Sequence, residues 1–420
     1  MGEVIWLRAQ NQCHYHESSV GVFHSTVSRR RSAPTFDRSE LKALPMIRLS
    51  LRLNVLLSIT IVIGTSAFAV QRTVDNSPNS PGQFTSLQDA IYASSATNPR
   101  DTLLITGTNI SYGTVTVDRP LVLIGAGYNP NSLQTIVDQV NIRSSDVFLT
   151  GLHCGVSFEL NDAPGDSIAN VIITRCQIGS PGTIGFIGST QAGAGRLVDI
   201  KIINNVISST NGYMFNGCDV GPYMQFDSLL FANNISARFG FNSGCLPQFQ
   251  GTETFIMDHN LFIGPSGSGI FTDQFGTAAW NNSSAVLSNN IFHLQNAGGI
   301  QGCGQCTWFN NLTTATGGGN DSIPGTPLGN MNLWSVDPTT VLVNYPGGQF
   351  DWSHDYSLQS GSPALGNGTF GTDIGPFDGP YPFELGVPPA GPFIEYFNVD
   401  GSAIEINGDV IINFKAYGRP

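Results

Sequence analysis

Three carboxylates stand at nearly the same distance before a repeated asparagine turn, and this spacing could build an acidic site. Asp227 and Glu253 each precede a turn asparagine by seven residues, and Asp199 precedes one by six. If each repeat forms one layer of a stack, neighbouring layers lie ~4.8 Å apart and bring these carboxylates together. Carboxylates that close can bind Ca²⁺ or divide acid and base roles, with Asp273 as a further catalytic candidate. The alternative is that these acids only cap the starts of strands.

Aromatic residues gather in three long segments, 209–226, 237–252 and 264–284. Exposed aromatic rings pack against the C–H faces of sugars, and a few polar groups orient the ligand. These segments therefore predict a glycan-binding surface, with Arg238 as a polar contact. The alternative is that the rings pack the segments onto the body of the protein. The ring residues are Tyr213, Phe215, Tyr223, Phe239, Phe241, Phe271, Phe275 and Trp280.

The turns that set this spacing form an internal repeat. In five places an asparagine-containing turn is followed directly by an apolar residue, and its second asparagine falls at 205, 234, 260, 290 and 311. The steps of 29, 26, 30 and 21 residues are typical of a solenoid, in which each repeat forms one coil. Aligned strands extend this register back through Cys176 and Leu152.

The strands before each turn are short, rich in β-branched and aromatic residues, and bounded by Gly, Asn or Ser. This pattern predicts an all-β protein folded as a right-handed parallel β-helix. Asparagine tolerates the left-handed backbone of a tight turn, and stacked amides can hydrogen-bond from coil to coil. We therefore expect a structural role for the asparagines. The interior column is expected to contain Ile202, Phe231, Met257, Leu287 and Trp308.

A short helix is expected at the N-terminal end of the solenoid, over 85–93. Leu87, Ala90 and Ile91 fall on one face of this helix, and Thr85 and Ser86 are capping candidates. Such a helix covers the open end of the stacked coils.

Two stretches resemble secreted bacterial right-handed β-helix proteins of the pectate-lyase-like superfamily. Near the beginning, the segments TSLQDAI, DTLLI and YGTVTVDRPLVLIGAG resemble the first coils of those proteins. Near the end, DYSLQSGSPALGNG and DIGPFDGPYPF resemble their closing coil. The resemblance covers roughly residues 73–385 and implies the fold. It implies no single activity, because the superfamily includes lyases, hydrolases and adhesins.

Motifs of the superfamily's enzymes are missing from the chain. There is no Asn-Thr-Asp with a following Asp-Asp, Gly-His-Gly and Arg-Ile-Lys, as in polygalacturonase-like hydrolases, and no paired arginine segment with a lysine, as in pectate lyases. Arg175, Arg196, Lys201 and Arg238 are too scattered in sequence to neutralise a uronate substrate.

The N-terminal 69 residues have the composition of an export signal behind an extension. Residues 1–45 are polar and irregular, and translation starting at Met46 would remove them. Residues 46–69 then supply a basic start, an apolar run and Ala67-Phe68-Ala69, which is typical of a cleaved signal peptide. The alternative is an uncleaved signal anchor. Either interpretation predicts a secreted or cell-surface protein.

Export changes the charge of the chain. Residues 1–69 hold 8 of the 18 basic and 4 of the 30 acidic residues, so the mature chain has 10 basic and 26 acidic groups, a net charge of −16. This surface repels nucleic acid and anionic lipid, and suits a strongly anionic glycan only if a cation intervenes. We expect a monomer whose only membrane contact is through residues 46–69.

Six of the seven cysteines belong to the mature chain, where disulfides are allowed. Cys218 and Cys245 occupy nearly the same position in adjacent repeats, which favours a bridge between them. Cys154 and Cys176 lie within apolar strands and are expected in the core.

These patterns divide the mature chain into a β-helix over 70–385 and a C-terminal β segment or cap over 386–420. The leading hypothesis is glycan binding through the aromatic segments. A polysaccharide lyase or glycoside hydrolase and a structural or adhesive surface protein are the alternatives.

Overall fold

The computed structural model describes residues 69–78, 82–160, 167–179, 186–189, 196–208, 215–217, 225–237, 254–264, 285–294, 307–314, 331–386, 393–400 and 411–417. Residues 1–68, including most of the predicted export signal, lie outside this set. Among the described residues, no helix is both long and apolar enough to span a membrane.

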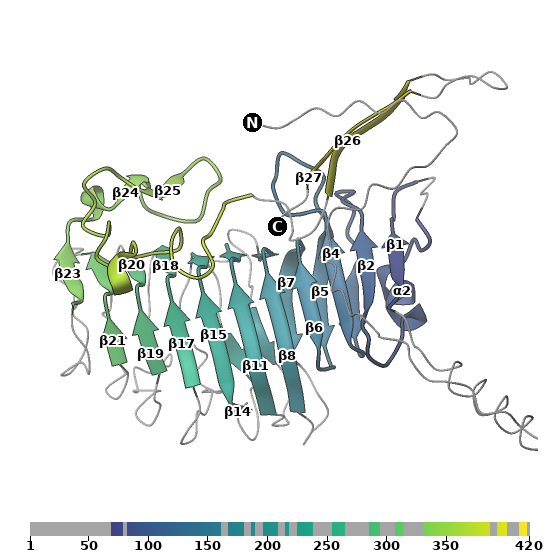
Figure 1. The fold of residues 1–420 in the computed structure, drawn as a ribbon, viewed down its shortest axis with the longest axis horizontal. Helices are drawn as coiled ribbons and strands as arrows, with labels where there is room; N and C mark the ends of the chain where they lie inside the picture. The colour runs from purple at the N-terminus through teal and green to yellow at the C-terminus, as the bar shows by residue number, and fades with distance from the viewer. Residues whose placement is uncertain are drawn as a thin grey trace, which may run out of the picture. The chain divides into compact units, whose positions relative to one another are not determined.

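The predicted parallel β-helix is confirmed, because two long sheets stack coil upon coil along one axis (Figure 1). We call the first sheet A. It contains β1 (Gln71–Val74), β2 (Asp101–Ile105), β4 (Leu121–Gly125), β6 (Val147–Thr150), β8 (Ser167–Thr174), β11 (Arg196–Ile203), β14 (Gln225–Phe226), β15 (Ser228–Ala232), β17 (Thr254–Asp258), β19 (Ala285–Ser288) and β21 (Thr307–Phe309).

We call the second sheet B, and in the coils with an asparagine turn its strand comes directly after that turn. It contains β3 (Thr114–Val117), β5 (Ile136–Ile142), β7 (His153–Leu160), β9 (Gln177–Ile178), β10 (Phe186–Ser189), β12 (Val206–Ile207), β13 (Phe215–Gly217), β16 (Ile235–Ser236), β18 (Leu261–Gly264), β20 (Ile291–Leu294), β22 (Leu312–Thr314) and β23 (Leu333–Val336). All described strand pairs in the two sheets are parallel.

The interior column has the predicted members. Ile202 pairs with Phe231, Phe231 with Met257, Met257 with Leu287, and Leu287 with Trp308, and all five are fully buried. Cys154 and Cys176 are also buried as free thiols, and burial raises the pKa of each to about 12. Both cysteines are therefore core residues, as expected.

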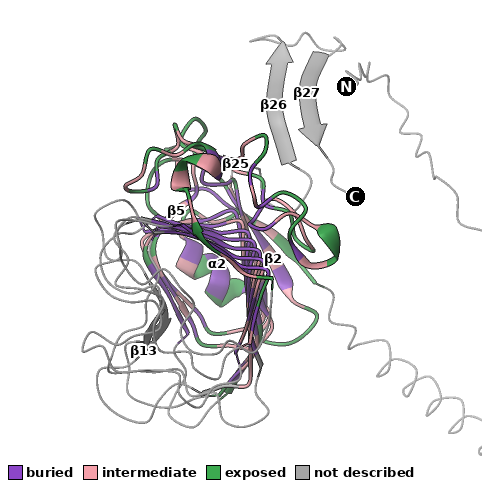
Figure 2. Cartoon of the chain, turned by 90° about the vertical axis from the view of Figure 1, so that its left-hand side faces the viewer, coloured by how far each residue is buried: buried purple, intermediate pink, exposed green. Residues whose placement is uncertain are grey.

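The N-terminal helix is also confirmed. α2 (Leu87–Ala93) begins after Ser86, whose hydroxyl accepts a hydrogen bond from the Asp89 backbone N–H at 3.2 Å. Leu87, Ala90 and Ile91 are buried in the main core. Viewed along the stack, α2 lies across the far end of the interior (Figure 2).

The second asparagine of each turn forms the predicted hydrogen-bonded ladder. The side-chain amide of Asn205 donates to Asn234 at 3.1 Å, Asn234 to Asn260 at 3.0 Å, and Asn260 to Asn290 at 2.9 Å. The ladder continues through Asn311 and ends at Asn332. Each of these hydrogen bonds contributes about 1 kcal/mol, and the pairing satisfies buried polar groups.

The left-handed backbone belongs to the first residue of each pair, a detail that the sequence alone did not resolve. Positive φ angles occur at Asn204, Asn233, His259, Asn289 and Asn310, whereas the ladder residue follows one position later. The two residues of a turn therefore point to opposite sides of the wall. The five positive-φ residues are called the outer turn column below.

A second apolar core covers the outer face of sheet B. Val206, Ile235, Leu261, Ile291 and Leu312 point away from the interior and pack with side chains from the C-terminal part of the chain. That part contains η1 (Pro338–Thr340), the antiparallel pair β24 (Leu342–Asn344) and β25 (Asp355–Leu358), and η2 (Thr369–Gly371), and it supplies Val341, Phe350, Tyr356 and Phe383.

The stretch that resembles a closing coil takes a different course. Residues 363–386, called the return segment below, run back along the turns from Asn310 toward Asn204 (Figure 1). At its end Gly386 lies beside Asn129. The predicted C-terminal strands are β26 (Phe393–Asp400) and β27 (Ile411–Tyr417), which pair with each other in a sheet of their own.

Candidate functional site

The three aromatic-rich segments are anchored on stacked strands. Each follows a sheet B strand in the register Val206–Ile235–Leu261, and each precedes a sheet A strand in the register Leu229–Phe255–Ala285. Strands in one register lie ~4.8 Å apart from coil to coil. The points where the segments leave and rejoin the solenoid therefore stack along its axis.

Most predicted site residues lie outside the described side chains, and only backbone is described for Phe215. It begins β13, where it pairs with Ile187 of β10. Both cysteines of the predicted disulfide also lie outside the described residues. The remaining residues outside the described set are Tyr213, Tyr223, Arg238, Phe239, Phe241, Glu253, Phe271, Asp273, Phe275, Trp280, Cys218 and Cys245.

The two described acids of the predicted cluster are both ion-paired. Asp227 Oδ1 accepts hydrogen bonds from Arg196 Nη2 at 2.6 Å and Nε at 2.9 Å. Asp199 lies 3.1 Å from Lys201 Nζ. The strand register sets Asp199 opposite Ser228, whose hydroxyl accepts from the Asp199 backbone N–H at 2.8 Å, so the two acids are offset by one position. Surface pairs of this kind contribute about 0–1 kcal/mol.

Metal binding was expected from Asp199, Asp227 and Glu253. Within the described part of the chain, no group of three His, Cys, Asp or Glu side chains is arranged to hold an ion. Glu253 falls outside that part.

The outer turn column holds the return segment in place. Asn233 donates to the backbone oxygens of Pro376 at 2.8 Å and Asp378 at 2.7 Å, and Asn310 donates to that of Asn367 at 2.8 Å. Asn289 instead accepts from the Thr369 backbone N–H at 2.8 Å. These contacts connect residues 57 to 145 positions apart in sequence.

With its amide nitrogen turned toward the return segment, Asn204 donates to the Tyr381 backbone oxygen at 2.7 Å. Four of the five residues of the outer turn column thus form hydrogen bonds to the return segment through an asparagine side-chain amide. The column therefore fixes the return segment across neighbouring coils.

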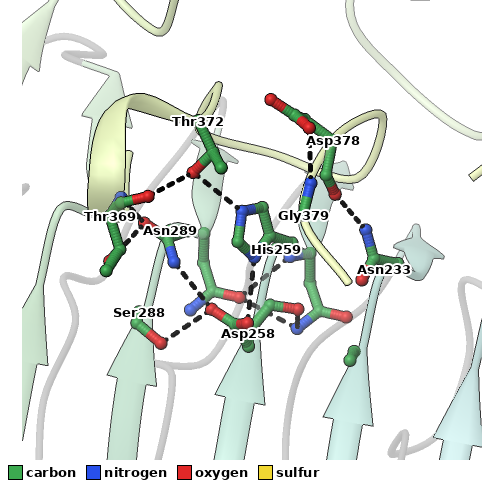
Figure 3. Close-up of polar contacts among 12 residues, drawn as sticks. Asn233, Asp258, His259, Ser288, Asn289, Thr369, Thr372, Asp378 and Gly379 are labelled. Atoms are coloured by element: carbon green, nitrogen blue, oxygen red, sulfur yellow. Dashed lines mark hydrogen bonds and ion pairs between the residues drawn. The ribbon is translucent and has the colours of Figure 1, made fainter. Parts of the chain in front are cut away.

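His259 replaces asparagine in this column and forms a different contact (Figure 3). Its Nδ1 lies 2.9 Å from Asp258 Oδ2 without the alignment of a linear hydrogen bond, and its Nε2 lies 3.4 Å from the Thr372 hydroxyl. That hydroxyl donates to the Thr369 backbone oxygen at 2.9 Å. His259 is 3% exposed.

Carboxylate, imidazole and hydroxyl are the groups of a hydrolytic relay, but this arrangement lacks the working geometry. A base must lie within hydrogen-bond reach of the proton it removes. Here the Thr372 proton points to a backbone oxygen, and the buried ring offers no approach to a substrate. The cluster is a structural joint.

Asp258 is held ionised within this joint. Burial alone would raise the pKa of Asp258, but the His259 ring and hydrogen bonds from Ser288 at 2.7 Å and Asn289 at 2.8 Å lower it below its usual value. The carboxylate thereby connects two neighbouring coils.

Gly379 closes the joint from above. Its φ is +84°, and a Cβ at this position would come 2.7 Å from the His259 ring. Glycine is required here both for the left-handed backbone and for the close approach. In the sequence, this joint is marked only by the histidine that replaces asparagine in one of the five turns. The return segment that completes the joint has no periodic pattern from which its position could be predicted.

Comparisons with models of protein families and with curated proteins give no match to this chain.

Proposed function

We propose that this chain is an exported β-helix protein that binds glycan chains through the aromatic residues of segments 209–226, 237–252 and 264–284. The observation that carries the proposal is the stacked register of their anchoring strands, Val206–Ile235–Leu261 and Leu229–Phe255–Ala285. Three segments rich in rings, attached at successive coils, suit a polymer that extends along the solenoid axis.

The charge of the chain favours a neutral glycan. The mature chain has a net charge of −16, from 10 basic and 26 acidic residues. On the outer face of the coils, Arg196 is engaged by Asp227 and Lys201 by Asp199. An anionic polymer would have to break these pairs or bring its own cations.

The ion pairs of Asp227 and Asp199 favour binding of a glycan without its cleavage. Asp227 accepts two hydrogen bonds from the Arg196 guanidinium, so this carboxylate is already engaged within the protein and is not free to contact a substrate. Turnover would then depend on Glu253 or Asp273. The variants Asp227→Asn and Glu253→Gln test this directly, since a glycan-cleaving enzyme would lose product formation in at least one of them.

A structural or adhesive role is the second candidate, and the asparagine ladder favours it. A continuous chain of side-chain hydrogen bonds from Asn205 to Asn332, buried as far as Asn311, stiffens a solenoid along its axis. Such a body would serve as a spacer without any ligand.

A glycan array with the exported chain separates these functions. The proposal expects retention on neutral glycans and little on uronates. If neither neutral glycans nor uronates are retained, glycan binding is overturned and the structural role is the remaining candidate. Release of shortened oligosaccharides from a retained glycan would instead indicate an enzyme.

A further inference from the structure

The outer face of sheet A carries an apolar stripe that is interrupted at one coil, by Lys201. In the register of the sheet, one outward-pointing column runs from Thr102 to Thr307, and six of the seven residues between these two threonines are apolar. All are partly exposed, whereas the interior residues on either side of them are buried. The stripe consists of Val122, Phe148, Ile172, Leu230, Ile256 and Val286.

The two sheets differ in what covers them. Parallel sheets are normally covered on both faces, because their strands are apolar on both sides. The outer face of sheet B packs under the C-terminal part of the chain, with Val206, Ile235 and Leu261 fully or nearly fully buried. The equivalent column of sheet A retains exposure from Val122 to Val286. This face is therefore suited to a further apolar layer.

Lys201 occupies the centre of the column. Three apolar residues precede it and three follow it, one from each coil. Its ammonium lies 3.1 Å from Asp199, so it can enter an interface as an ion pair and not as a lone charge. A column that reads nearly the same in both directions matches itself when one copy is turned by two-fold rotation.

We propose that the outer face of sheet A binds a second copy of this chain, with a two-fold axis parallel to the strands at the level of Lys201. The two solenoids then run antiparallel, with Ile172 of one copy opposite Leu230 of the other and Val122 opposite Val286. This proposal differs from the monomer expected from the sequence, and it does not depend on the proposed glycan site.

The size of the face sets the strength of the dimer. Six rises of ~4.8 Å and strands of ~17 Å give about 500 Å² on each copy. The total of about 1,000 Å² is at the lower limit for a specific interface, so we expect micromolar affinity. The net charge of the mature chain opposes association at long range, so added salt tightens the dimer by screening that repulsion.

Sedimentation velocity of the exported chain with outward lysines tests the interface. The variants Ile172→Lys and Leu230→Lys place an unpaired charge in the stripe and should raise the dimer Kd by at least about 100-fold. The matched control is Val156→Lys, which changes another exposed apolar residue, 41% exposed, on β7 of sheet B and should leave the dimer intact. Unchanged circular dichroism shows that each variant is folded.

Cysteine crosslinking tests the orientation. With a short bis-maleimide, the double variant Ile172→Cys, Leu230→Cys should give crosslinked dimers well above the wild-type background, and Ile172→Cys alone should not. A monomeric wild type at micromolar concentrations would overturn the proposal. Dimers that survive both lysine variants would overturn it as well, and crosslinking by Ile172→Cys alone would overturn the antiparallel arrangement.

Discussion

Asn233 and Asn234 are neighbours in sequence but bind on opposite sides of the same wall. The Asn234 amide donates inward to Asn260 at 3.0 Å, whereas the Asn233 amide donates outward to the backbone oxygens of Pro376 and Asp378. The positive φ of Asn233 produces this division by reversing the direction of the chain between the two side chains. One turn thus joins the coil above and the return segment.

Replacing a ladder residue should be costly. Asn234→Leu removes side-chain hydrogen bonds to Ile202 and Ala232 oxygens and to Asn260, and it leaves the Asn205 backbone N–H without its acceptor. We expect a loss of about 3–5 kcal/mol, because several buried polar groups lose their partners together. Urea unfolding measures this loss. The control Asn131→Leu, at an exposed loop position, should change stability by less than about 0.5 kcal/mol. Equal effects of the two variants would show that the ladder contributes little.

The joint under the return segment predicts a specific steric effect. Gly379→Ala would bring a methyl group 2.7 Å from the His259 ring at a φ of +84° and should destabilise by about 3 kcal/mol. Gly348→Ala has a similar φ of +93° but open space around it, so it isolates the backbone cost of about 1–2 kcal/mol. Thermal unfolding compares the two. In the Gly379→Ala background, His259→Ala should recover part of the difference, and no recovery would mean that the clash is not with His259.

Acid should weaken the contact between coils at Asp258. The pKa of this carboxyl is lower in the folded chain than the ordinary value of 3.8, so its stabilising effect is complete above about pH 4 and is lost as the pH falls through the folded value. Asp258→Asn should therefore destabilise the protein at neutral pH, and its difference from wild type should shrink below about pH 4. Melting temperatures from pH 7 to pH 2.5 test the sign. A difference that stays constant over this range would rule out ionised Asp258 as the source.

Export makes a separate prediction about the N-terminus. If residues 46–69 are a cleaved signal, the secreted protein begins at Val70. Val70 donates its backbone N–H to Asp101 at 2.7 Å, so the first residue of the mature chain would already be held by the first coil. Mass spectrometry of the secreted N-terminus decides between cleavage and a retained anchor. An intact 46–69 segment would support the anchor.

The sequence predicted those features that arise from local periodicity. The interior column from Ile202 to Trp308 and the ladder follow from one repeated turn, and the Ser86 cap follows from helix chemistry. The sequence did not predict the course of the return segment, because its hydrogen bonds join Asn233 to Asp378 across 145 residues and involve mostly backbone oxygens. Backbone acceptors leave no signature in residue type.

The predicted acidic stack shows a second limit of counting along the chain. Asp199 is six residues before its turn and Asp227 seven, and this single-residue difference decides the register. Asp199 has a φ of +51°, which breaks the regular strand, and it faces Ser228. Spacing alone could not show that each acid would find a basic partner, Arg196 for Asp227 and Lys201 for Asp199.

The most direct test of the proposed function is calorimetric binding of the best neutral glycan from the array to three proteins. Wild type and Phe370→Ala, which removes a fully exposed ring from the return segment, should bind equally. Trp280→Ala should raise the Kd by about tenfold, because an aromatic platform for the sugar is lost. Equal affinity of wild type and Trp280→Ala, or a larger loss in Phe370→Ala, would contradict glycan binding through the aromatic segments.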